Sequence, residues 1–153
     1  MSTPKKTRWL QVAKRASEFR LLQGSSEMAE ATQRADAAQA ALKASQHLSQ
    51  RAQSAWRDHL SKPVFHAGDD AQFRHFQGVL KETELRDDEA AERARAELEI
   101  AQLALRMQLA EKNALQAAIQ NVAERFRLEE TRTGQKETDE VWSVTQYQLG
   151  TAP

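Results

Sequence analysis

The sequence has no cysteine, and it has few proline, glycine or aromatic residues along its 153 positions. Without cysteine the chain has no disulfide framework, no thiolate nucleophile and none of the usual zinc sites, which is consistent with a reducing compartment. Aromatic residues make up only 6%, and much of the 40% hydrophobic content is alanine. This composition, together with 29% charged residues, is typical of long helices and coiled coils rather than of a compact globule.

Neither sign of charge is in excess. Lys plus Arg and Asp plus Glu both total 22, so the formal net charge is zero. No global field therefore draws the chain to nucleic acid or to an acidic membrane. No uncharged apolar run approaches the roughly 20 residues that cross a bilayer, and the apolar run after Arg8 is too short for a signal peptide. We expect a soluble cytoplasmic protein whose partners recognise local patches.

Three of the few residues that break helices, Pro63, Gly68 and Gly78, lie between Trp56 and Leu85. Pro63 lacks a backbone N–H, Gly68 tolerates positive φ, and the following aspartates can cap a helix, so the chain is expected to reverse here. We predict an all-α fold, a long antiparallel two-helix coiled-coil hairpin on the order of 75 Å in length. Its expected segments are helix 1 at about 7–60, a turn at 61–69, helix 2 at 70–131 and a partly helical C-terminal tail at 132–153.

The first helix has two runs of helical spacing. Trp9, Val12, Ala16 and Phe19 lie three and four residues apart, and a second run extends from Met28 to Trp56. A slip in register is therefore predicted at Gly24, within a continuous helix, because one glycine costs only about 1 kcal/mol. The second run consists mainly of Ala and Ser, which bury little apolar area, so the hairpin should be slender.

The second helix has a wider apolar face, made of two neighbouring stripes. One stripe comprises Leu98, Ala101, Leu105, Leu115, Ile119, Val122 and Phe126. The other comprises Ile100, Leu103, Met107, Ala110, Ala114 and Ala117. A wide face suits more than one neighbouring helix, which would be helix 1 and a binding partner. The apolar residues Val141, Trp142, Val144 and Tyr147 either pack back on Trp9, Val12 and Phe19 or anchor another protein.

The sequence shows no set of residues that indicates catalysis. The histidines at 47, 59, 66 and 75 match no metal-ligand spacing, and no phosphate-binding or nucleophile motif occurs. Adjacent carboxylates such as Asp87 and Asp88 alternate with basic residues, as solvated helix faces do. A slender hairpin also has no water-excluding pocket. We predict a protein that is not an enzyme, with no catalytic residues, no cofactor and no metal.

Two charged segments and one aromatic cluster are candidates for interaction. Basic residues dominate the N-terminal segment, where Glu18 is the only acid: Lys5, Lys6, Arg8, Lys14, Arg15 and Arg20. An acidic run follows the predicted turn: Glu82, Glu84, Asp87, Asp88, Glu89 and Glu92. Aromatic residues flank the turn: Trp56, Phe65, Phe73 and Phe76. Each group is either a docking surface or a local feature, solvated in the case of the charges and closing the turn in the case of the aromatics.

Several of these features together resemble a known family. They are a basic-aromatic start, an aromatic patch on either side of a glycine-containing turn, and a charged C-terminal stretch. The residues concerned are Arg8, Trp9, Leu10, Arg15, Arg20, Trp56, Leu60, Gly68, Phe73, Phe76, Leu80, Glu129, Glu130, Lys136, Glu137, Asp139, Glu140, Val141 and Trp142. The chain resembles the small coiled-coil stalk proteins of bacterial type III secretion and flagellar export, the FliJ/YscO group, which includes members from plant-pathogen systems.

The resemblance implies a central-stalk or adaptor role at the secretion apparatus, on its cytoplasmic side, and some family members are themselves exported. A monomer would insert its joined ends into the secretion ATPase hexamer, with no nucleic acid bound and no direct membrane insertion. The implied ATPase contacts are Arg8, Lys14, Arg15, Arg20, Arg125, Arg127 and Arg132. The implied contacts with the export gate or with chaperones are Trp56, Leu60, Phe73, Phe76 and Leu80.

Two other functions are compatible with the residues alone. A homo-oligomeric coiled-coil scaffold without an ATPase partner would pair two hairpins in a four-helix bundle through the wide face of helix 2. A nucleic-acid clamp at the basic end is opposed by the zero net charge and the interspersed acids. The oligomeric state separates the scaffold from the stalk.

Overall fold

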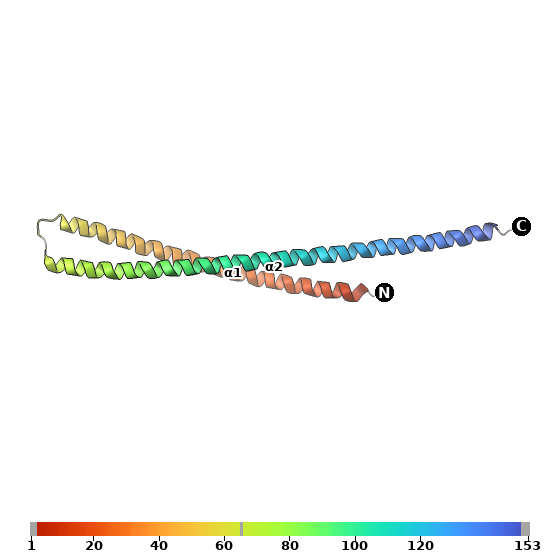
Figure 1. Cartoon of the computed structure of the whole chain (residues 1–153), viewed down its shortest axis with the longest axis horizontal. Helices are drawn as coiled ribbons and strands as arrows, with labels where there is room; N and C mark the ends of the chain where they lie inside the picture. Colours follow the sequence, from red (N-terminus) through yellow and green to blue (C-terminus); the bar gives the residue numbers. More distant parts are fainter. Residues whose placement is uncertain (1–2, 65, 151–153) are drawn as a thin grey trace. The chain divides into compact units, whose positions relative to one another are not determined.

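A computed structural model describes the backbone of residues 3–64 and 66–150, and the side chains of these segments from Thr7 onward. Two helices account for nearly all of it: α1 (Thr3–Leu60) and α2 (Ala67–Gly150), joined by a short loop (Figure 1). The described residues contain no strand, which confirms the predicted all-α helical hairpin. The chain divides into a hairpin part, residues 21–107, and a terminal part, residues 1–20 with 108–153.

In the hairpin part, α1 and α2 pack antiparallel along one continuous seam. Its positions follow one another at alternating intervals of three and four residues, the 3.5-residue repeat of a coiled coil. On α1 the buried and half-buried seam positions are Leu21, Gly24, Met28, Ala31, Ala35, Ala38, Leu42, Ser45, Ser49, Ala52 and Trp56. On α2 they are Phe73, Gln77, Leu80, Glu84, Asp87, Ala91, Ala94, Leu98, Ala101 and Leu105.

Small side chains recur on α1 at every seventh position of this seam. They are Gly24, Ala31, Ala38, Ser45 and Ala52. Their size lets the two backbones approach closely, while the larger seam residues Leu42 and Leu80 are 7% and 6% exposed. Polar contacts across the seam hold the register: Ser49 Oγ donates to Glu84 Oε2 at 3.1 Å, and Arg95 Nη2 donates to Gln39 Oε1 at 3.0 Å.

The predicted slip in register at Gly24 is wrong. Buried or half-buried positions continue through Ser17, Leu21, Gly24 and Met28 without a break in the alternation, and α1 is one helix. The apparent slip arose because the apolar residues nearest the N-terminus were taken as inward. They face away from α2, with Trp9 72% exposed. Gly24 is a seam residue whose missing side chain suits a close helix contact, so it does not interrupt the helix.

The loop is shorter than predicted. Capping bonds satisfy the end of α1, with Ser61 N–H donating to the Arg57 carbonyl at 3.1 Å and Ser61 Oγ donating to the Asp58 carbonyl at 2.7 Å. α2 begins at Ala67 rather than near residue 70, and Asp69 and Asp70 lie in its first turn, where the helix dipole favours negative charge. The expected role of Gly68 in the reversal is wrong, because this residue is helical and no described glycine has positive φ.

In the terminal part, the same spacing continues on both helices. Half-buried α2 residues are Gln108, Lys112, Leu115, Ile119, Val122 and Phe126, and on α1 Ser17 is 1% exposed. Arg20 Nη2 lies 3.3 Å from Glu111 Oε1 across the two helices. Both sets of observations show that the ends of the helices pack on each other here, as an antiparallel hairpin requires.

α2 continues to Gly150, whereas the sequence predicted its end at residue 131. From Arg127 onward every described side chain is exposed. An exposed Gly134 costs the helix only about 1 kcal/mol, and the flanking Gln, Lys and Glu residues are good helix formers. Thr138 Oγ1 donates to the Gly134 carbonyl at 2.8 Å, a bond that accompanies the helical backbone without adding to its stability. The expected interruption is therefore too weak to end the helix.

Candidate protein-interaction surfaces

An aromatic stack closes the tip of the hairpin. The rings of Trp56 on α1 and Phe73 on α2 lie 4.1 Å apart between centroids with an angle of 6° between their planes. The His59 ring also stacks on Trp56, with 5.4 Å between the ring centroids. His59 Nε2 lies 3.2 Å from Asp69 Oδ2 at the start of α2. Trp56 and Phe73 are half-buried. The sequence left two roles open for the tip aromatics, binding a partner or closing the turn. Trp56 and Phe73 close the turn.

The other residues predicted to bind a partner at the tip divide into exposed and buried ones. Leu60 and Phe76 are 50% and 47% exposed, whereas Leu80 is 6% exposed in the seam. Leu80 is thus a core residue, and its assignment to a partner surface was wrong. The helical spacing of apolar residues does not show which face of the helix packs on α1. Val64 and Val79, which the sequence reading missed, are 63% and 46% exposed. Phe65 lies outside the described residues.

We define the tip surface as Leu60, Val64, Phe76 and Val79. Phe76 and Val79 are three residues apart and share one side of α2, while Leu60 is the last residue of α1 and Val64 lies in the loop. All four are apolar and exposed. A signal for this surface exists in the sequence, since Val79 and Phe76 fall between the seam positions Phe73, Gln77 and Leu80.

A second surface lies on the N-terminal turns of α1. Trp9, Val12 and Phe19 are 72%, 60% and 62% exposed, and their spacing of three and seven residues places them on one side of the helix, away from α2. Arg8 and Arg15 are exposed beside them and form no ion pair within the described part of the chain. We call these five residues the basic-aromatic surface.

The remaining predicted contacts of the terminal part are of two kinds. Lys14 Nζ lies 3.9 Å from Glu18 Oε1, and Arg20 pairs with Glu111, so these two cations already have partners within the chain. Three arginines on α2 are exposed: Arg125, Arg127 and Arg132. The side chains of Lys5 and Lys6 lie outside those described. The structure thus brings only part of the predicted cationic set to a free surface.

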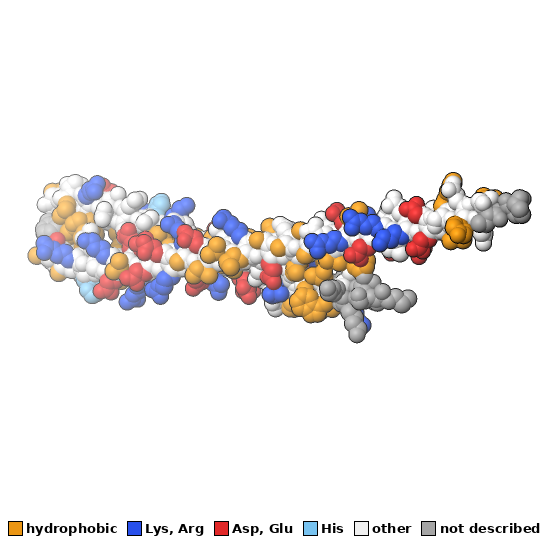
Figure 2. Space-filling view, turned by 45° about the vertical axis from the view of Figure 1, so that its right-hand side comes forward, with side chains coloured by type: hydrophobic (Ala, Val, Ile, Leu, Met, Phe, Trp, Pro, Cys, Tyr) orange, Lys and Arg blue, Asp and Glu red, His pale blue; other side chains and the backbone are white. Residues whose placement is uncertain are grey.

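The apolar residues near the C-terminal end of α2 do not pack back on α1. Val141, Trp142, Val144 and Tyr147 are 65%, 64%, 57% and 78% exposed. Hydrophobic side chains are visible near that end of α2 in the space-filling view (Figure 2). Of the two alternatives in the sequence reading, packing on the N-terminal turns of α1 is therefore ruled out for these residues, because the helix carries them beyond the last half-buried position, Phe126.

The wide apolar face predicted for helix 2 is split by the structure. The first stripe, which includes Leu98, Ala101 and Leu105, is half-buried in the seam. The second stripe is exposed, with Ile100, Leu103 and Met107 at 69%, 58% and 65%, and the alanines at 110, 114 and 117 also exposed. We call Ala96, Ile100, Leu103 and Met107 the back stripe of α2. The first stripe therefore packs on α1, the first of the two expected neighbours, and no part of the described chain covers the second stripe.

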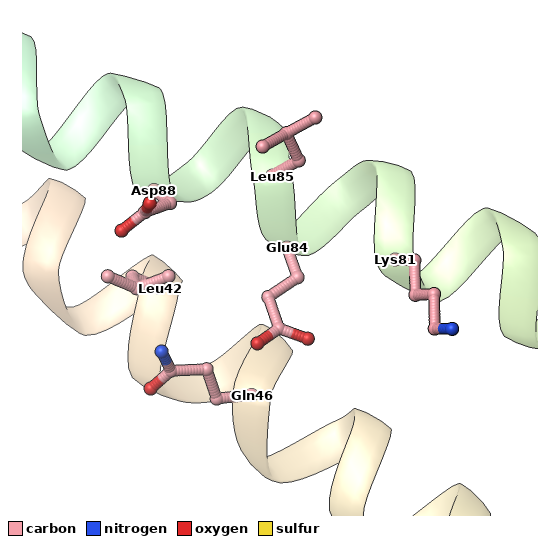
Figure 3. A pocket seen from close by; sticks show the side chains of 6 residues that line it. All are labelled: Leu42, Gln46, Lys81, Glu84, Leu85 and Asp88. Atoms are coloured by element: carbon pink, nitrogen blue, oxygen red, sulfur yellow. The ribbon is translucent and has the colours of Figure 1, made fainter.

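A groove of about 390 Å³ follows the seam near the middle of the hairpin part (Figure 3). Leu42 and Gln46 line it from α1, and Lys81, Glu84, Leu85 and Asp88 line it from α2. Glu84 points across to α1 and accepts the bond from Ser49, so its position is explained by the helix pairing. The groove is shallow and open to water, and such a site does not exclude solvent from a reaction.

The described residues form no cluster typical of a metal site and no membrane span. No three His, Asp or Glu side chains come together there as a metal site would require. Neither described helix contains an apolar segment long enough to span a bilayer. Along the face seen in Figure 2, acidic and basic side chains alternate with hydrophobic ones. The candidate sites among the described residues are therefore exposed surfaces rather than enclosed pockets.

Comparison of the chain with models of protein families, with curated proteins and with solved structures found no match. What the structure defines is the class, an all-α coiled-coil hairpin with exposed apolar surfaces.

Proposed function

We propose that this protein is a central-stalk or adaptor component of a bacterial type III secretion system. In this role the terminal part binds the secretion ATPase hexamer, and the tip surface binds an export-gate protein or a secretion chaperone. The chain works at the cytoplasmic side of the apparatus. The proposal rests on the resemblance to the FliJ/YscO group, and the observation that carries it is the basic-aromatic surface.

That surface combines two properties of a docking site. Three large apolar side chains, Trp9, Val12 and Phe19, remain exposed on a helix whose other face is packed. Two exposed guanidinium groups, Arg8 and Arg15, flank them and form no ion pair within the described part of the chain. Aromatic residues and arginine are the side chains that contribute most to binding at protein interfaces, and an acidic partner would be steered toward the arginines.

The tip supports the second contact in a similar way. The Trp56–Phe73 stack holds the two helix ends together, so the tip surface is presented on a closed scaffold that need not order itself on binding. Preorganisation of this kind lowers the cost of association. Phe76 of the tip surface is therefore expected to contact the gate or chaperone, whereas Phe73 supports it from behind.

The test is binding of the purified chain to the secretion ATPase of the same organism. We expect Arg8→Glu with Arg15→Glu to weaken the complex by about tenfold or more, since buried or rim charge pairs at interfaces are worth a few kcal/mol together. The matched control is Arg51→Glu with Arg86→Glu, which reverses two arginines that are also exposed and have no ion pair in the described hairpin part. Equal binding by both double variants would contradict the assignment of the surface.

The alternative function, a homo-oligomeric scaffold without an ATPase partner, has a distinct signature. It predicts that the unaltered chain is a stable homo-oligomer that binds no ATPase at any salt concentration. Light scattering coupled to size exclusion, with the chain alone and then mixed with the ATPase, distinguishes the two. One copy of the chain per ATPase ring supports the stalk.

A further inference from the structure

The back stripe of α2 repeats the pattern of the seam on the opposite side of the same helix. Ala96, Ile100, Leu103 and Met107 are spaced by four, three and four residues, which is the interval pattern of a coiled-coil interface. Their neighbours Leu98, Ala101 and Leu105 hold the same pattern toward α1. Over residues 96–107, α2 therefore has two coiled-coil faces, and α1 covers only one.

We propose that the back stripe binds a second copy of this chain, with the two α2 helices antiparallel and related by a two-fold axis near residues 101 and 102. In this register Ile100 of each copy packs against Leu103 of the other. Ala96 of each copy packs against Met107 of the other, so a small residue meets a large one in the outer layers. A two-fold interface of this kind is self-complementary, as homodimer contacts must be.

Charge on the border of the stripe favours this orientation. Glu99 and Arg106 lie seven residues apart on the same border, both are exposed, and neither forms an ion pair in the described part of the chain. The antiparallel arrangement places Glu99 of each copy against Arg106 of the other, giving two reciprocal pairs. A parallel arrangement would place Glu99 opposite Ala104, which cannot pair with it.

The inference does not depend on the proposed secretion role. The back stripe shares no residue with the basic-aromatic surface or with the tip surface, so dimer formation and ATPase binding are tested by different substitutions. A dimer of the free chain departs from the monomer that the family resemblance implies. It means that a chain acting as a stalk would have to leave its second copy before entering the ATPase ring.

Sedimentation equilibrium of the purified full chain tests the interface. We expect a reversible monomer–dimer equilibrium for the unaltered chain and a monomer for Leu103→Glu, with unchanged helical circular dichroism because Leu103 is 58% exposed. The matched control is Leu22→Glu, which places the same charge at a leucine of 70% exposure on α1 and should dimerise as before. A monomeric unaltered chain, or an unaffected Leu103→Glu dimer, would overturn the proposal.

The ion pairs are tested by charge reversal. Glu99→Arg and Arg106→Glu should each weaken the dimer at low salt by about tenfold, since each replaces two attractive contacts with two repulsive ones. The double variant should restore most of the affinity. Failure of the double variant to recover, when each single variant is impaired, would overturn the antiparallel register.

The absence of native cysteine allows a direct test of orientation. Ala96→Cys and Met107→Cys are mixed as two single variants and oxidised with copper phenanthroline. The proposed register predicts a disulfide between the two different variants. Efficient coupling of Ala96→Cys to itself would indicate a parallel pair and would overturn the proposal.

Discussion

At the scale of single residues, the seam depends on side chains that are small rather than on side chains that are large. Ala31 is 2% exposed and lies among the every-seventh positions of α1. A methyl group fits there because the two helix backbones are close. The apolar area buried per turn is modest, so the stability of the hairpin is sensitive to any residue that forces the helices apart.

Ala31→Leu is therefore expected to destabilise the hairpin by about 1–3 kcal/mol through overpacking, although leucine is a good helix former and is more hydrophobic. Chemical denaturation followed by circular dichroism measures the change. Ala37→Leu provides the control, because Ala37 is exposed on the same helix and should leave the stability nearly unchanged. If both substitutions have the same effect, close packing at Ala31 is not the reason for its small size.

At the scale of the elements, each helix is longer than its own propensity would suggest. α2 has 84 residues and includes Gly78 and Gly134, and a methyl group built at either glycine would meet nothing within 4 Å. Both glycines therefore weaken the helix without serving a close contact. They differ in setting, because Gly78 lies in the paired hairpin part and Gly134 lies beyond the last half-buried residue of α2.

Gly78→Ala is expected to stabilise the paired hairpin by about 0.5–1 kcal/mol, as removal of a helix-interior glycine does. Gly134→Ala should increase the helical circular-dichroism signal at low temperature without moving the main unfolding transition. Thermal melts of the two variants beside the unaltered chain measure both quantities. A shift of the main transition by Gly134→Ala would show that the C-terminal turns of α2 unfold together with the hairpin.

At the scale of the molecule, the paired helices and the unpaired end of α2 have different sources of stability. Paired residues are held by the seam, whereas every described side chain from Arg127 onward is exposed and adds no buried or half-buried position to the seam. Most of the stability of helices in proteins comes from packing of one face rather than from helix propensity. This end is therefore expected to be the first segment to lose its helical structure on heating.

Removal of residues 129–153 should leave the midpoint of the main thermal transition within about 2 °C of its original value, because no seam residue is lost. A deeper truncation that ends after Gln120 removes the half-buried Val122 and Phe126 and should lower the midpoint clearly. Circular dichroism at several temperatures compares the three chains. Destabilisation by the shorter deletion would mean that the exposed end of α2 packs on something in the protein.

Much of the architecture was predictable because it depends on local rules. The scarcity of Gly and Pro, the helical spacing and Pro63 were enough to place two antiparallel helices and the reversal between them. The errors have separate origins. The slip in register at Gly24 was predicted because the apolar residues nearest the N-terminus were taken as inward. The helix was predicted to end before Gly134, although an exposed glycine costs a helix little.

The candidate surfaces were predicted less well than the fold. Leu60, Phe76 and the basic-aromatic residues are exposed as a binding role requires, but Leu80 is buried and Trp56 and Phe73 stack on each other. Helical periodicity shows that apolar residues share a face. It does not show whether the chain itself or another protein covers that face.

The sequence alone determined that this chain forms long helices that reverse near Pro63, since helix propensity and the 3.5-residue spacing act over a few neighbouring residues. Only the tertiary structure decided which stripe of each helix is the seam. That choice depends on which pair of faces lets the backbones approach most closely, and small residues such as Ala31 and Ala91 settle it over the more hydrophobic Ile100 and Leu103. The larger apolar side chains are consequently left on the outside, where they are available to partners.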